Sequence, residues 1–289
     1  MPASKFTQSI AALTVFFTFI YIASHQRPSG KPILSSGTTG RVTPDISLKP
    51  VMRERDFREL ALELPDSLLP FERGVLTNKE ISLSFDACPT GGRNHFDKAV
   101  FKVLQQTHTP ATVFVSGKWV EEDSNDTRLL ASDSLIELAN HSFSHPHLTS
   151  LSVEKVRKEL QRTQTIISNL TGQVPLFFRA PYGELNDSLI NTARQMGLVT
   201  VQFDVESGDP DTSFTAERLI KWVTKKTRNG SVIIMHINNR GWHTAEALPS
   251  IIAELEAKGF TFVKVSALLK QVIEERKSDS PGLAGSMQK

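Results

Sequence analysis

Short apolar runs that alternate with amphipathic stretches from residue 80 onward constrain the fold more than any other feature of this chain. Residues 81–85 alternate apolar and polar side chains, as a strand with one buried face does. The stretches between such runs place apolar residues three and four positions apart, which is typical of helices that pack on a sheet. Strands that alternate with helices in this way predict an α/β fold with a parallel sheet. The seven predicted strands are residues 81–85, 111–115, 135–139, 176–178, 199–203, 232–235 and 260–264.

Helices are predicted between and after these strands. Ser152 is a candidate N-cap, because its hydroxyl can accept a hydrogen bond from a free N–H of the first helical turn. The helix that it begins carries Val156, Leu160 and Ile167 on one face. The predicted helices are residues 96–106, 152–170, 187–196, 216–228, 245–258 and 266–275.

Polar and titratable side chains recur directly after the predicted strands. These residues are Asp86, His141, Arg179, Asp209 and His236. In a (β/α) barrel the carboxyl ends of all strands meet at one mouth, where active sites are built. The recurrence therefore favours an enzyme.

His141 and His145 stand four residues apart where a predicted strand runs into a turn. On such a turn both imidazoles can face one divalent cation, and imidazole suits zinc and other late first-row metals. The same spacing also occurs among ordinary surface or core histidines. The spacing alone is a weak signal, and the neighbouring motifs are what favour a metal pair.

The carboxylate and the arginine have both a chemical and a structural interpretation. Asp86 can bind the cation or act as a general base, or it can simply cap the following turn. Arg179 can keep Asp86 ionised, or it can form a structural salt bridge. Pro181 stiffens the next turn, so that the backbone N–H of Tyr182 can face an oxyanion.

His236 ends a buried apolar strand, and a polar tip at that position is suited to a general acid. The alternative is a core histidine with its hydrogen bonds satisfied. The acidic loop 204–209 can orient a histidine and raise its pKa, or it can be a solvated loop.

The N-terminus indicates export. Lys5 precedes an apolar run over residues 10–23, which is shorter than the roughly 20 residues that span a membrane. We therefore predict a signal peptide or N-terminal membrane anchor at residues 1–24, so that the protein is secreted, periplasmic or tethered to the membrane. Residues 25–76 are rich in Ser, Gly, Thr and Pro at their start and are interpreted as a flexible stalk and covering segment.

Charge and cysteine content limit the remaining classes. The net charge of +2 gives no electrostatic reason to expect a nucleic-acid partner. The single cysteine, Cys88, excludes an intrachain disulfide, so that stability must come from an ordinary core.

Five blocks, in this order and spacing, resemble the polysaccharide deacetylase family, also described as the NodB-homology domain or carbohydrate esterase family 4. The likeness covers about residues 77–269. The blocks are Ser84-Phe85-Asp86, His141-Ser142-Phe143-Ser144-His145, Arg179-Ala180-Pro181-Tyr182, residues 204–209, and Ile234-Met235-His236. Together they form a specific signal, although each block alone is weak.

This resemblance implies a distorted (β/α)7 barrel at residues 77–270, followed by a polar tail at 271–289. It implies a monomer that removes acetyl groups from N-acetylated glycans with a divalent metal, usually zinc, with cobalt or nickel as alternatives. By the likeness, His141 and His145 bind the metal, and Asp86 is the general base, braced by Arg179. The same likeness makes Tyr182 part of an oxyanion hole, and it makes His236 the general acid, tuned by Asp209.

The first motif departs from the family. The family has a second, metal-binding aspartate where this chain has Ala87, and a methyl group cannot bind a cation. Asp86 can then move to the metal, or Cys88 can supply a thiolate, although a buried passive cysteine is the simpler interpretation. A subgroup of the family shares this Phe-Asp-Ala-Cys form. Two further departures are Pro210, in place of an expected tryptophan, and the segment 237–243 after His236.

These departures keep three other functions open. One is a metal-free amidohydrolase on the same scaffold, and another is a catalytically silent glycan-binding domain. A cysteine hydrolase that uses Cys88 is a more distant alternative.

Overall fold

The computed structural model describes residue 59 and residues 64–89 and 96–279. In this part of the chain, eight strands form one sheet in the order β5-β4-β3-β2-β1-β7-β6, with β8 beside β1. All of these strand pairs are parallel. The strands are β1 Glu80–Ala87, β2 Ala111–Val115, β3 Ile136–Asn140, β4 Phe177–Phe178, β5 Val199–Thr200, β6 Val205–Glu206, β7 Val232–His236 and β8 Thr261–Phe262.

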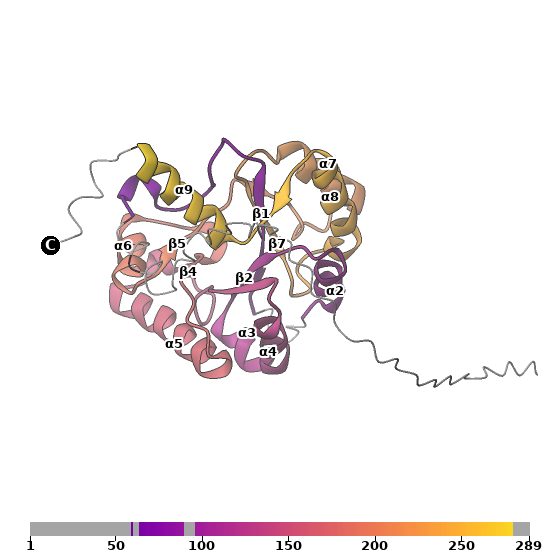
Figure 1. The fold of residues 1–289 in the computed structure, drawn as a ribbon. Coiled ribbons are helices and arrows are strands. Elements are labelled where there is room, and N and C mark those ends of the chain that lie inside the picture. Colours follow the sequence, from indigo (N-terminus) through magenta and orange to yellow (C-terminus); the bar gives the residue numbers. More distant parts are fainter. Residues whose placement is uncertain (1–58, 60–63, 90–95, 280–289) are drawn as a thin grey trace, which may run out of the picture. The chain divides into compact units, whose positions relative to one another are not determined.

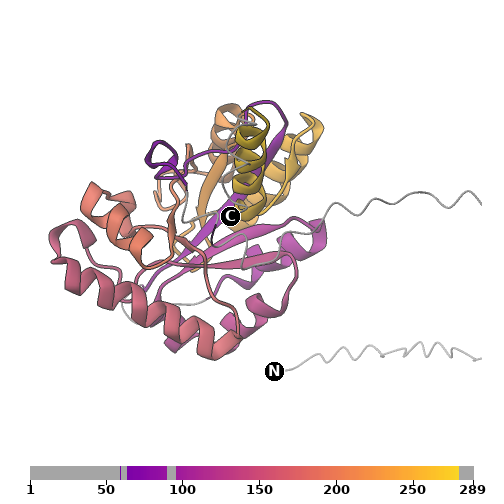
Figure 2. The ribbon, with the colours of Figure 1, turned by 60° about the vertical axis from the view of Figure 1, so that its left-hand side comes forward.

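The α-helices lie around the sheet, as Figures 1 and 2 show. They are α2 Lys98–Thr107, α3 Gly117–Glu122, α4 Ser124–Ser132, α5 Val153–Thr171, α6 Asp187–Gln195, α7 Ala216–Lys226, α8 Thr244–Ala257 and α9 Val265–Asp279. Short 3-10 turns occur at η1 Asp66–Leu68, η2 Leu148–Ser150 and η3 Pro181–Gly183. The side chain of Ser152 accepts a hydrogen bond from the Lys155 N–H at 3.4 Å, which confirms the predicted cap of α5.

The sheet is an open barrel, which confirms the predicted fold class. Its path ends at β5 on one side and at β6 on the other, and the chain crosses from one to the other over residues 201–204. Phe71 forms a parallel bridge with Val201 beside this opening, and Arg73 bridges Ser231 next to β7. The segment before β1 therefore lies along the edge of the sheet.

Side-chain alternation along β1 separates the hydrophobic core from the site. Ile81, Leu83, Phe85 and Ala87 belong to one large apolar cluster with residues of α2, α7 and α8. Ser84 and Asp86 point to the opposite face, where they meet Arg179. A second cluster joins Phe114 on the inner face of β2 to Leu268 of α9, so that α9 packs against this side of the sheet.

The structure adds elements that the sequence pattern does not predict. Helices α3 and α4 fill residues 117–132, where Trp119, Val120 and Leu130 are buried. These helices are too short for the apolar spacing to stand out. Strand β6 has only two residues, and α9 continues to Asp279, so that its last turns include the first residues of the segment 271–289.

The predicted leader at residues 1–24 lies outside the described residues, as does most of the predicted stalk. Within the described part of the chain, no helix has the length and apolar character needed to span a bilayer.

Candidate active site

A buried arginine organises the inner face of the sheet. Arg179 follows β4, and its side chain donates hydrogen bonds to Asp86 Oδ1 at 2.9 Å, Ser84 Oγ at 2.8 Å and the Gln202 carbonyl at 3.2 Å. Its guanidinium also lies 4.0 Å from the ring centroid of Phe114. Asp86 is only 5% exposed. The predicted pairing of Arg179 with Asp86 is therefore present, and it fixes one carboxylate oxygen while the other faces the site.

His141 lies next to this carboxylate. Its Nδ1 donates to the Arg179 carbonyl over 2.9 Å, so that Nε2 carries the lone pair, and Nε2 is 3.5 Å from Asp86 Oδ2. The rings of His141 and His145 are edge to face, with centroids 4.9 Å apart. Both imidazoles therefore reach the same side of the site as Asp86.

The turn that carries the two histidines is held in an unusual backbone conformation. Ser142 and His145 both have positive φ, near 60°. Glu159 of α5 accepts from the N–H groups of Phe143 at 2.9 Å and Ser144 at 2.7 Å, and from the Ser144 hydroxyl at 2.8 Å. Three hydrogen bonds to one carboxylate stabilise a turn that would otherwise be strained.

A second acid–imidazole pair lies beside the first. The register of β1 and β7 places His236 opposite Asp86. His236 Nδ1 is 2.9 Å from Asp209 Oδ1, and the His236 backbone N–H donates to Asp209 Oδ2 at 2.7 Å. Asp209 is fully buried, and it also accepts from the hydroxyls of Ser207 at 2.9 Å and Thr244 at 2.8 Å. These contacts fix the ring so that Nε2 of His236 faces away from Asp209.

A pocket of about 180 Å³ brings these groups together. Its lining includes Asp86, Arg179, His145, Tyr182 and His236. The remaining lining residues are Cys88, Ala180, Gly183, Phe203, Glu206, Pro210, Ile234 and Arg240. Residues far apart in the sequence therefore meet in one cavity at the carboxyl ends of β1, β4 and β7.

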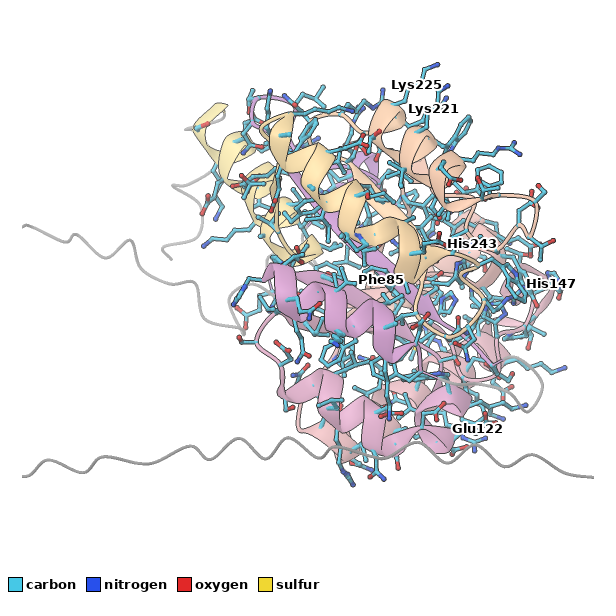
Figure 3. All side chains as sticks on the ribbon, turned by 90° about the vertical axis from the view of Figure 1, so that its right-hand side faces the viewer. Phe85, Glu122, His147, Lys221, Lys225 and His243 are labelled. Carbon is cyan, nitrogen blue, oxygen red and sulfur yellow. The ribbon has the colours of Figure 1, made fainter. Side chains whose placement is uncertain are left out.

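Exposed rings lie on the rim of this pocket. Tyr182 is 56% exposed, has positive φ in turn η3, and donates its hydroxyl proton to the His145 carbonyl at 3.3 Å. The His147 ring stacks on Tyr182 with centroids 4.2 Å apart. Figure 3 shows His147 and His243 toward one edge of the view and Lys221 and Lys225 on α7 toward another.

The pKa values differ sharply between the histidines. Burial lowers the pKa of His141, and burial together with the nearby His141 lowers the pKa of His145 to about 3. Both rings are therefore neutral near pH 7, as metal-binding imidazoles must be. Burial also acts to lower the pKa of His236, but the Asp209 carboxylate outweighs it and the pKa is raised. His236 is thus the imidazole suited to carry a proton.

The pKa values of Asp86 and Cys88 are also shifted. Burial acts to raise the pKa of Asp86, but its interactions with the His141 imidazole, the Arg179 guanidinium and the His236 imidazole outweigh burial and hold that pKa below its usual value. Asp86 is therefore an ionised base. Burial, with the nearby Asp86 charge, raises the pKa of Cys88. A buried neutral thiol is a poor nucleophile, which argues against a cysteine hydrolase.

One predicted part of the site lies elsewhere. Asp204, at the start of the acidic loop, accepts from the Val232 N–H at 2.9 Å and forms an ion pair with Arg228 at 3.1 Å. These contacts are at the beginning of β7, whereas His236 is at its end. Of the acidic loop, Asp209 alone contacts His236 through its carboxylate, and Asp204 braces the sheet.

Sequence reasoning did not single out several residues that hold the site. Ser84 precedes Asp86 by two residues, and strand alternation would have placed both on one face. Glu159 and Thr244 gave no local signal, because their partners lie 15 or more residues away in the sequence.

The donor set fits a cation only in part. Two donors bound to one zinc ion at about 2.1 Å with tetrahedral angles lie about 3.4 Å apart, and His141 Nε2 and Asp86 Oδ2 are 3.5 Å apart. Ala87, however, is buried in the apolar cluster and offers no ligand. Among the described residues, no group of three or more His, Cys, Asp or Glu side chains is arranged to hold a metal ion. The predicted set of His141, His145 and Asp86 stays a prediction.

The mouth of this open parallel barrel brings together a buried carboxylate, an imidazole whose pKa is raised and two imidazoles whose pKa values are lowered, an arrangement suited to hydrolysis. The polysaccharide deacetylase family model matches residues 73–201. The chain is 30% identical over 207 residues to a peptidoglycan-N-acetylglucosamine deacetylase of Bacillus cereus, which covers 71% of this chain and 73% of that protein. The chain therefore belongs to the polysaccharide deacetylase family, and the predicted family and hydrolase class are confirmed.

Two solved structures similar to this chain are a metal complex and a pseudoenzyme. An acetyl xylan esterase of family 4 from Clostridium thermocellum, in complex with a cobalt ion, is 29% identical with a TM-score of 0.60, covering 66% of this chain and 91% of that chain. A family 4 pseudoenzyme from Bacillus anthracis is 26% identical with a TM-score of 0.63, covering 69% of this chain and 68% of that one. The family thus includes both metal-bound enzymes and inactive members.

Proposed function

We propose that this protein removes acetyl groups from an N-acetylated glycan by hydrolysis of the amide bond. The observation that supports it most directly is the shared pocket, which is lined by Asp86, His145 and His236. The likeness to a peptidoglycan deacetylase supports the substrate class. The exposed Tyr182 on the rim of the pocket is suited to contact a sugar ring.

Amide hydrolysis needs a general base, a donor to the oxyanion and a general acid, and residues of this site can take these roles. Asp86, ionised and braced by Arg179, takes a proton from the attacking water. The N–H of Tyr182 stabilises the oxyanion that forms on the carbonyl oxygen. His236, protonated and oriented by Asp209, gives a proton to the leaving sugar amine, which would otherwise depart as a poor anion. The products are acetate and a free amino sugar.

We also propose that His141 and His145 hold a divalent cation, zinc or else cobalt or nickel. Asp86 is the candidate third ligand, and in that role it would no longer be a separate base. The neutral rings of the two histidines and the fixed Nδ1–H of His141 support this assignment. When bound, such a cation acidifies its water and polarises a carbonyl. The family structure with a cobalt ion supports the general use of a metal.

The site of action and the assembly state are proposals as well. Residues 1–24 are proposed to export the protein or to anchor it to a membrane, on the strength of their apolar run. We propose a monomer. Light scattering on the protein without its leader tests the assembly state, and a dimer would contradict the proposal.

The decisive experiment is acetate release from N-acetylglucosamine oligomers by purified protein, after chelation and after addition of zinc, cobalt or nickel, with metal analysis in parallel. The expected result is release that needs a metal and that falls at least about a hundredfold in the His236→Gln variant. Exposed His108, at the end of α2, provides the matched control: His108→Gln is expected to keep full activity.

Other outcomes identify the alternatives. Activity that survives chelation would indicate a metal-free amidohydrolase, which the alanine at position 87 favours. Glycan binding without turnover would indicate a silent binding domain, as the pseudoenzyme likeness suggests. Loss of activity in the Cys88→Ala variant, with stability unchanged, would indicate a hydrolase that uses the Cys88 thiol. Absence of both turnover and binding would refute the proposed function.

A further inference from the structure

The loop between β7 and α8 is built as a rigid part of the pocket wall. Asn238 donates a side-chain hydrogen bond to the Cys88 carbonyl at the end of β1. At the other end, the Trp242 backbone N–H donates to the Asp209 carbonyl at 2.8 Å. The loop is therefore tied to two different parts of the catalytic site.

The backbone of this loop is strained and closely packed. Asn239 and His243 have positive φ, at 57° and 60°. A Cβ added at Gly241 would lie 2.2 Å from Thr244 Oγ1 and 2.9 Å from the His236 carbonyl oxygen. Such strain persists only where the surrounding structure fixes the conformation, and it is common at sites of recognition. The loop therefore holds its side chains in place before any ligand arrives, which lowers the entropic cost of binding.

Arg240 is the cation that this loop presents to the pocket. Its side chain lines the cavity together with His145 and His236, and the residue is exposed. Its side chain contacts the neutral Cys88 thiol, with Nη1 3.9 Å from Sγ. Within residues 64–89 and 96–279, no carboxylate lies within ion-pair distance of Arg240. Arg179, the other arginine of the pocket, is by contrast already paired with Asp86.

We propose that Arg240 binds a carboxylate carried by the glycan, so that the enzyme prefers acidic N-acetylated glycans to neutral ones. A guanidinium matches a carboxylate with two parallel hydrogen bonds, and no group in the described structure uses that capacity. The proposal rests on the proposed deacetylase function, because it places the acidic group next to the acetamide that reacts.

The charges around the pocket decide where this carboxylate lies. Glu206 also lines the cavity, and its negative charge disfavours an anion on its own side. His236 lines the same cavity as Arg240. The carboxylate therefore lies toward the loop. It can come from a uronic acid or from a lactyl ether on an amino sugar, which present the same group from different positions.

Binding is measured by calorimetry at low salt with three tetrasaccharides. The first is neutral N-acetylglucosamine tetramer, the second alternates N-acetylglucosamine with glucuronic acid, and the third alternates N-acetylglucosamine with its lactyl ether. The full chain carries His236→Gln so that bound glycan is not consumed. Acetate release from each glycan is measured in parallel without that substitution.

The protein is expected to bind at least one acidic glycan about tenfold or more tightly than the neutral one. Arg240→Gln is expected to bring this ratio close to one, and Arg240→Lys to keep part of it. Arg128→Gln on α4 removes an equivalent exposed arginine outside the pocket and is expected to leave the ratio unchanged. The glycan that shows the preference identifies the source of the carboxylate.

Equal binding of all three glycans, or a preference that survives Arg240→Gln, would overturn this inference even if acetate is released. A preference that depends on Arg240, with no acetate released from any glycan, would keep the inference and refute the proposed function. Failure to bind any of the three would overturn both.

Discussion

Replacing Arg179 with methionine tests whether the buried ion pair holds the site together. The substitution keeps an unbranched apolar side chain, but it removes the guanidinium that lies over the Phe114 ring and pairs with a carboxylate that is only 5% exposed. Breaking a buried pair in this way costs about 3–5 kcal/mol of unfolding free energy. At about 2–4 °C per kcal/mol for a domain of this size, the midpoint of thermal unfolding should fall by about 6–20 °C.

The assay is urea unfolding followed by near-UV circular dichroism at pH 7. Arg162→Met is the matched control. Arg162 also lies over an aromatic ring, that of Phe143, and pairs with Glu121, but its side chain is 55% exposed. Exposed pairs are worth about 1 kcal/mol or less, so this control should change stability little.

A double mutant separates the ion pair from general packing damage. Asp86→Asn removes the charge that Arg179→Met leaves unpaired, so the double variant should be less destabilised than the sum of the two single variants. Additive losses, or a loss for Arg179→Met no larger than that for Arg162→Met, would refute this interpretation.

The pH dependence has a definite sign. The folded-state pKa of Asp86 is depressed, so its ionisation stabilises the fold above the unfolded pKa, and this contribution is lost as the pH falls through the folded pKa. Without Arg179 the pKa of Asp86 rises, and the variant takes up the proton at a higher pH. The difference in stability between the two proteins should therefore shrink on acidification from pH 7.

Three further changes probe the rest of the site. Asp209→Asn removes the charge that raises the pKa of His236, so the alkaline limb of the pH profile of kcat/KM should move to lower pH. An alkaline limb at the wild-type pH would exclude His236 as the general acid. Glu159→Gln weakens the hydrogen bonds that hold the turn with His141 and His145, so zinc affinity should fall about 10–100-fold in a competition titration. An unchanged zinc affinity would show that Glu159 is not needed to hold this turn. Gly241→Ala should lower the melting temperature and activity together, because its Cβ would meet the Thr244 hydroxyl; wild-type values for both would show that the loop can relax.

Individual strands and members of the site could be predicted from the sequence, for different reasons. Strand β2 matches its predicted range, 111–115, because a fully buried parallel strand is a continuous apolar run. Asp86, Arg179 and His236 meet because parallel strands deliver their carboxyl ends to one edge, and that rule needs no knowledge of distant contacts.

What the sequence did not reveal depends on contacts between distant segments. The barrel opens between β5 and β6, and β6 was not predicted because a strand of only two residues is too short to give a periodic signal. Asp204 and Asp209 look alike in the acidic loop, yet one braces the start of β7 and the other binds His236 at its end. Only the path of the chain between them decides which carboxylate reaches the site.

The alanine at position 87 shows how strand geometry and metal chemistry compete for the same residue. Along β1 the alternation that turns Ser84 and Asp86 inward turns Phe85 and Ala87 toward the outer apolar cluster. A methyl group there is fully buried and stabilises the packing, whereas a carboxylate in the same orientation would lose its hydration without a partner. A metal ligand at position 87 would therefore require the end of β1 to twist away from this register. In this chain the alanine favours the packed strand, and the proposed cation site is left with His141, His145 and Asp86 as its candidate ligands.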